Sequence, residues 1–274
     1  MATKEAEPFQ PVALDSRFEI RRLESSQHRD WAKAILLHTN IFHSPVWSII
    51  YPDKQFDKIS QGWEAMKYLV DLQIDSGWSF GVFDREYKFK RPESAATGGK
   101  LYWDLTNAGA SAADLLEQMD FPLVSIALSY DGINPPEPAK LGPLIGLIPA
   151  FGTLYMELAA RDSRDPTSWK ARKAGEVLMR NGTSTRADYE GNGVMKKAAW
   201  WLMREAARKG FTAIQIECVH DAVTHVWSHP PEPFKADVVA SFDSKTLEYE
   251  DADGNKTKPF YPAKQVVSAI YVRL

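Results

Sequence analysis

The feature that most constrains the fold is a strand, a glycine turn, a helix and a second strand, which follow one another between residues 177 and 218. Residues 177–187 contain the β-branched residues Val177, Thr183 and Thr185 and lack helical periodicity, so they predict a strand. An apolar stripe at helical spacing comes next, at Val194, Ala198, Trp201, Leu202 and Ala206. Gly210 ends this helix, and residues 211–218 predict the next strand. The segment therefore predicts a domain that contains both sheet and helix.

The turn in this segment predicts an anion site. It contains Gly191-Asn192-Gly193 directly before the helix. A Gly-x-Gly turn at the start of a helix presents main-chain N–H groups that have no partner, and such groups favour a phosphate. We therefore expect a phosphorylated cofactor in front of this turn.

The rest of the chain predicts one domain over residues 17–274, preceded by a disordered tail over residues 1–16. The expected strands are at about 18–22, 78–84, 100–105, 123–130, 236–242 and 265–274. One expected helix starts at 25 or 26 and a single one extends over 56–74, and others lie near 111–119 and at 221–227. Residues 85–100 read as a loop, and a helical insertion is expected over about 131–173.

Composition and charge exclude several classes of function. The net charge is −3, the pI is near 6.1, and no long basic run is present, which argues against nucleic acid and anionic membranes as partners. The uncharged run at 141–156 is too short to span a bilayer. The single cysteine, Cys218, excludes an internal disulfide and favours a cytoplasmic location. A small-molecule substrate is the expectation that remains.

The order of elements, together with the sequence Glu190-Gly-Asn-Gly-Val-Met195, resembles the Gcn5-related N-acetyltransferase superfamily. In that family the turn usually reads Gln/Arg-x-x-Gly-x-Gly/Ala. Gly193 matches the first required glycine, whereas Glu190 and Met195 depart from the pattern. The resemblance implies an α/β (α+β) fold with a mixed, mostly antiparallel central sheet flanked by helices, and the expected insertion precedes the cofactor-binding strand.

The resemblance also implies acetyl-coenzyme A as co-substrate, with transfer of the acetyl group by direct attack of a small, partly hydrophobic amine. The strand before the turn is expected to bind the pantetheine arm and the turn to bind the pyrophosphate. These cofactor residues are Ser184, Thr185, Arg186, Ala187, Gly191, Asn192, Gly193, Val194, Met195 and Lys196. A main-chain N–H of the strand is expected to stabilise the oxyanion that develops on the thioester.

A general base is needed, because the amine must lose a proton before it attacks. Three residues at the end of the second strand are possible bases, namely Glu217, His220 and Asp221, although a polar residue there is commonly solvated or caps a helix. In the family, a tyrosine on the next helix usually gives a proton to the leaving thiolate, and this chain has Trp227 near that position. His225 and Tyr189 are the alternative donors of this proton.

Metal and thiol chemistry find little support. The histidines have no recognisable metal spacing and no Cys-x-x-Cys exists, so no metal site is expected. Cys218 lies among apolar residues of an expected core strand, which favours a buried, unreactive thiol. Residues 144–155, with Trp78, Phe80, Tyr102 and Trp103, are expected either to line an acceptor pocket or to fill the core.

Two other classes of function remain open. A non-catalytic binding module on the same fold accounts for Glu190, Met195 and the absent tyrosine together. A nucleotide-dependent oxidoreductase or methyltransferase ranks third, since its fingerprint needs a further glycine where this chain has Lys196.

Overall fold

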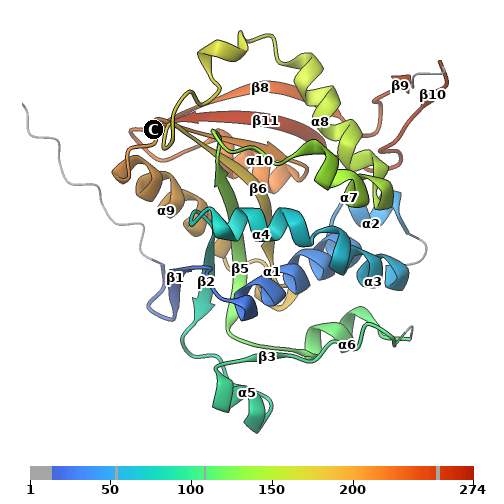
Figure 1. Ribbon diagram of the computed structural model, residues 1–274, viewed down its shortest axis with the longest axis vertical. Coiled ribbons are helices and arrows are strands. Elements are labelled where there is room, and N and C mark those ends of the chain that lie inside the picture. Colours follow the sequence, from blue (N-terminus) through green and yellow to red (C-terminus); the bar gives the residue numbers. More distant parts are fainter. Residues whose placement is uncertain (1–13, 53–54, 108, 251–253) are drawn as a thin grey trace, which may run out of the picture.

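The computed structural model describes residues 14–52, 55–107, 109–250 and 254–274 (Figure 1). Its centre is a seven-stranded sheet in the order β1-β2-β5-β6-β7-β11-β8. The bounds are β1 Phe18–Arg22, β2 Phe80–Asp84, β5 Leu123–Asp131, β6 Val177–Thr185, β7 Ala213–Cys218, β8 Lys235–Asp243 and β11 Val266–Arg273. Neighbouring strands are antiparallel except β6 and β7, which are parallel. The predicted mixed, mostly antiparallel sheet is confirmed.

Helices cover both faces of the sheet. On one face, α9 (Val194–Arg208) and α10 (Asp221–Ser228) bury Leu202 and Trp227 against Ile214 and Ile216 of β7. On the other face, α1 (Ser26–His38) and α4 (Lys67–Asp75) pack on β2 and β5. Each helix buries the apolar stripe that predicted it, so burial of apolar area fixes its position.

The predicted insertion lies between β5 and β6 and is helical. It contains η2 (Pro138–Leu141), α7 (Gly142–Leu147), α8 (Pro149–Arg161) and η3 (Pro166–Ser168). Prolines occupy the first turns of these helices. A proline is tolerated there because the first residues of a helix do not donate a main-chain N–H within the helix. Leu154 and Leu158 of α8 pack on β8 and β11. Figure 1 shows α8 crossing these strands, with α7 reaching toward α3 (Gln55–Ala65).

Several local expectations are wrong. Residues 56–74 form two helices, α3 and α4, rather than one. The loop at 85–100 contains α5 (Pro92–Thr97), which ends at Gly98 with a φ of 75°. Of the strand expected at 100–105, only β3 (Lys100–Leu101) forms, and it pairs with β4 (Met119–Asp120) outside the main sheet. These short elements depend on contacts with distant residues.

The remaining elements are η1 (Thr39–His43), α2 (Trp47–Ile50), α6 (Ala112–Glu117), η4 (Ala187–Tyr189), β9 (Tyr249–Glu250) and β10 (Lys256–Thr257). The predicted disordered tail falls on residues 1–16, of which 1–13 lie outside the described residues. In the described part of the chain, no helix has both the length and the apolar character that a bilayer crossing requires.

Candidate active site

The strands β6 and β7 separate in the middle of the sheet. Their parallel pairing ends at Arg180 and Ile216, yet β6 continues to Thr185 and β7 to Cys218. On its other edge β6 stays paired with β5, where the register shifts opposite Leu128. The free edge of β6 therefore faces a gap, as the resemblance to the acetyltransferases implies.

Arg180 holds this irregular part of β6 in place. Its guanidinium donates to the main-chain oxygens of Leu128 (2.5 Å) and Gly182 (2.8 Å) and to Thr183 Oγ1 (2.7 Å). Gly182 has a φ of 99°, which favours glycine. Arg180 is 2% exposed, and burial lowers its pKa to about 9, so it remains charged at neutral pH. These three bonds replace strand pairing at the bulge.

A cavity of about 320 Å³ occupies the gap and extends between the helices on the α1 face. Its wall comes from α1, η1, α3, α4, α7, α8 and the ends of β6 and β7. Most of the lining is apolar and includes Leu37, Met66, Val70, Leu147, Phe151 and Leu154. The prediction that residues 144–155 line an acceptor pocket fits this wall.

Glu217 presents its carboxyl to this apolar cavity. Loss of water around the group raises its pKa from 4.5 to about 7, and a long hydrogen bond from Gln215 Nε2 (3.4 Å) opposes the increase only weakly. A carboxyl with this pKa can exchange a proton near neutral pH. Among the residues predicted as bases, Glu217 is the one whose environment favours that task.

Of the other predicted catalytic residues, His220 lines the cavity and Asp221 and His225 do not. His220 is at the mouth of the cavity, and its Nδ1 accepts a hydrogen bond from the N–H of Ala222 (3.0 Å), capping α10. Asp221 is exposed and accepts from the N–H of Val266 (2.9 Å). His225 is also exposed, with its ring 4.5 Å from that of His229. Neither Asp221 nor His225 lines the cavity.

The glycine turn is open to solvent. Gly191 and Gly193 have φ values of 79° and 67°, and a Cβ on either would meet nothing within 4 Å. Among the described residues, no acceptor is recorded for the main-chain N–H groups of 191–196. Glu190 joins this turn to the cavity, because it lines the cavity's edge. The free N–H groups and the open space fit a phosphate ester, although the Glu190 carboxylate would repel one.

In the segment predicted to bind the pantetheine arm, residues 184–187, some polar side chains are buried. The Ser184 and Arg186 side chains are buried, and the Thr185 carbonyl accepts from Thr39 Oγ1 (3.3 Å). Ala187 begins η4. The N–H groups on the free edge of this strand are the part that a ligand in the gap can reach. Further on, Met195 packs against the core and Lys196 lies 4.3 Å from the Trp200 ring.

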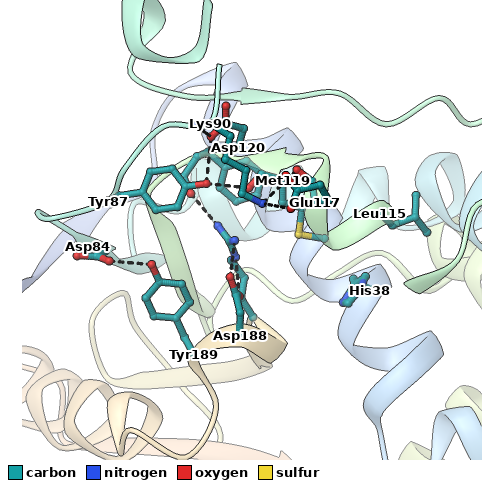
Figure 2. Close-up of polar contacts among 12 residues, drawn as sticks. His38, Asp84, Tyr87, Lys90, Leu115, Glu117, Met119, Asp120, Asp188 and Tyr189 are labelled. Carbon is teal, nitrogen blue, oxygen red and sulfur yellow. Dashed lines mark hydrogen bonds and ion pairs between the residues drawn. The ribbon is translucent and has the colours of Figure 1, made fainter. Parts of the chain in front are cut away.

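A polar network supports the turn from below. Arg186 donates to the carbonyl of Phe121 (2.8 Å) and to Asp188 (2.8 and 3.1 Å). Figure 2 shows Tyr189 bonded to Asp84 and Tyr87 beside Asp120, with hydroxyl-to-carboxylate distances of 2.7 and 3.1 Å. Tyr189 is thus engaged away from the cavity, so the arrangement does not favour it as the acid.

Of the two alternatives for the four aromatic residues, pocket wall or core, the structure does not place them in the wall. Trp78 packs on Phe211 (4.5 Å between rings) and Phe80 on Trp201 (4.9 Å), both in the core beneath α9. The other two, Tyr102 beneath Arg91 and Trp103 beside Trp63, are also outside the cavity lining. Cys218 is free and buried, as predicted. No metal-ligand cluster occurs among the described residues.

Two polar residues of the cavity were not predicted as functional. Tyr155 of α8 and Asn181 of β6 are joined there by a hydrogen bond from Asn181 Nδ2 to the Tyr155 oxygen. The tyrosine belongs to the insertion that was expected to contribute an apolar wall. Sequence spacing could not reveal the pair, because their contact depends on the packing of α8 on the sheet.

Comparison with known proteins gives structural matches alone. No protein-family model matches the sequence, and no curated protein matches it. The C-terminal condensation domain of Ebony, solved with beta-alanyl-dopamine, is 15% identical with a TM-score of 0.63, covering 94% of this chain and 99% of that domain.

Two acetyltransferase structures are also similar. Arylalkylamine N-acetyltransferase 2 from Aedes aegypti is 12% identical with a TM-score of 0.55, over 93% of this chain and 98% of that protein. An agmatine N-acetyltransferase is 11% identical with a TM-score of 0.52, over 94% and 100%. The separated parallel strands, the glycine turn before α9 and these matches lead to one conclusion: this chain has the fold of the Gcn5-related N-acetyltransferase superfamily.

Proposed function

We propose that this protein transfers an acyl group, most simply acetyl, from an acyl-coenzyme A thioester to the amine of a small, partly hydrophobic molecule. The observation that carries the proposal is Glu217, a carboxyl with a pKa of about 7 in an apolar cavity between two separated strands. The structural neighbours named as arylalkylamine and agmatine N-acetyltransferases support a small amine as acceptor.

The coenzyme is assigned to the turn and the free edge of β6. N–H groups of residues 191–196 hold its phosphates, and N–H groups among residues 181–185 bind its arm and the thioester oxygen. Bound there, the coenzyme supplies an activated acyl carbonyl. The Glu190 carboxylate weakens phosphate binding, because like charges at this short range repel.

The chemistry of the chain's own residues begins with Glu217. An alkylamine arrives protonated at neutral pH, and Glu217 accepts its proton. Apolar side chains of α7 and α8 exclude water and orient the amine toward β6. The fixed N–H groups of β6 stabilise negative charge on the acyl oxygen without having to reorient.

Two measurements test the proposal and separate it from a binding module. Acetyl-coenzyme A is added in a thermal-shift assay, where a ligand of the folded state raises the melting temperature. Thiol release is then followed with a panel of aromatic and aliphatic primary amines. We expect a positive shift and amine-dependent release. A shift without release from any amine identifies a binding module, and the absence of both refutes coenzyme binding.

A further inference from the structure

The hydroxyl of Tyr155 is held where the two strands separate. Helix α8 brings this side chain into the cavity, and the Asn181 side-chain amide donates a hydrogen bond to its oxygen. Asn181 is itself fixed, because Gln73 Nε2 donates to its main-chain oxygen at 2.5 Å. The Tyr155 oxygen is thus tied to the free edge of β6, which is the edge assigned to the thioester.

The direction of that hydrogen bond leaves a proton to give. A phenol that accepts from an amide still has its own O–H to donate, and here that O–H lies inside the cavity. Burial, and next the charge on Glu217, raise the pKa of Tyr155 well above 10, so the group stays protonated at neutral pH. It therefore carries a proton at neutral pH, and its position beside the free edge of β6, rather than its acidity, favours it as a donor.

Other groups near the gap are less suited to this task. Trp227 occupies the place of the family's tyrosine on α10, but it packs in the core beneath α9 and does not line the cavity, and an indole is not an acid at neutral pH. The Cys218 side chain belongs to the apolar core cluster that includes Ile216 and Trp227. Tyr51 also lines the cavity, but its oxygen accepts from the N–H of Ala150 (3.1 Å) in α8. Its hydroxyl is therefore held against a helix and not against β6.

We propose that Tyr155, supplied by the insertion, is the catalytic proton donor to the departing thiolate. The inference rests on the proposed function and deepens it. A bond forms between the amine nitrogen and the acyl carbon, the carbon–sulfur bond breaks, and its electron pair leaves with sulfur. Tyr155 gives its hydroxyl proton to that sulfur and regains one from the nitrogen of the new amide. The proton that Glu217 took from the ammonium passes to solvent.

The first test compares Tyr155→Phe with Tyr130→Phe. Tyr130 is a buried tyrosine on β5 whose side chain does not line the cavity, so its variant loses the same kind of hydroxyl nearby. With acetyl-coenzyme A and the best amine of the panel, Y155F should lower kcat by on the order of 100-fold and leave both KM values nearly unchanged. Y130F should keep kcat close to that of the wild type.

The second test measures binding without turnover. Calorimetry at alkaline pH compares coenzyme A with desulfo-coenzyme A, which lacks the sulfur. The wild type and Y130F should bind coenzyme A more tightly than desulfo-coenzyme A. Y155F should lose this preference, because it has no hydroxyl to donate to the thiolate of coenzyme A. Replacing Tyr155 by a fluorinated tyrosine, whose hydroxyl is more acidic, should add an alkaline decline to the pH profile of kcat. This variant keeps the ring and the hydroxyl, so it tests the role even if Y155F does not fold.

The outcomes separate the two proposals. If the wild type neither binds acetyl-coenzyme A nor transfers its acyl group, the proposed function fails. If the wild type is active but Y155F keeps its kcat and its preference for the thiol, the role of Tyr155 is refuted and the proposed function stands.

Discussion

Replacing Glu217 by Gln should stabilise the protein at alkaline pH while it removes activity. The folded protein holds the pKa of Glu217 at about 7, above the ordinary value of 4.5. Between these two values the folded state keeps a proton that the unfolded state has lost. The free energy of unfolding therefore falls as the pH rises through this window.

The size of the effect follows from the same two values. The difference between 4.5 and about 7, at about 1.4 kcal/mol for each pKa unit, corresponds to about 3 kcal/mol. Gln resembles the protonated carboxyl in shape, so at pH 5, just above the unfolded pKa, E217Q should exceed the wild type by less than about 1 kcal/mol. At pH 8 the variant should be more stable by about 3 kcal/mol, which raises the melting temperature by about 5 °C for a domain of this size.

The assay is denaturant unfolding of both proteins between pH 5 and pH 8, read as the difference between variant and wild type so that other titrations cancel. Glu205→Gln is the control of opposite sign, because the Arg208 hydrogen bond lowers the pKa of Glu205. Its carboxylate stabilises the fold above the unfolded pKa, and this contribution is lost as the pH falls. E205Q should therefore be less stable than the wild type at pH 8.

Kinetics provide the second half of this prediction. In the wild type kcat/KM should rise with pH through an apparent pKa near 7, as Glu217 loses its proton. In E217Q the rise should vanish, with kcat lower by at least about 100-fold. Parallel stability curves for the variant and the wild type would refute the reasoning about burial, whatever the activity of the variant.

The remaining predictions concern the turn and the cavity wall. Glu190→Gln should tighten coenzyme A binding several-fold in calorimetry, by removing a negative charge beside the phosphates, and an unchanged Kd would count against a phosphate site there. Gly193→Val should abolish that binding, since a β-branched residue resists a φ of 67°, whereas Gly175→Val, at a φ of 74° away from the cavity, should cause similar strain but leave Kd intact. Leu147→Trp should narrow the cavity and raise KM for the amine without changing the Kd of coenzyme A; equal effects on both ligands would contradict the assignment of α7 to the acceptor.

The sequence predicts the parts of this fold whose signals are local. The turn before α9 is an example, because Gly191 and Gly193 adopt positive φ angles that favour glycine. Gly210 likewise marks the end of α9, with a φ of 97°.

The contents of the cavity were harder to predict, because apolar residues in a wall and in a core follow the same pattern. Trp78 and Phe80 were possible wall residues, yet both face α9 on the opposite side of the sheet. The contact between Tyr155 and Asn181 also requires Gln73 and the packing of α8, which depend on long-range burial. For Glu217 the sequence suggested a base, and the raised pKa needed the surrounding structure.

The insertion that carries α7 and α8 joins β5 to its antiparallel neighbour β6, a connection that two or three residues could make as a plain hairpin. Strand order and register do not require a connection of this length, but Leu154 and Leu158 of α8 cover β8 and β11, so a replacement segment would have to bury the same face of the sheet. Under the proposed function, a changed insertion would alter the selectivity for the amine. If Tyr155 is the proton donor, such an insertion would also have to carry a hydroxyl at this position, so specificity and turnover would change together.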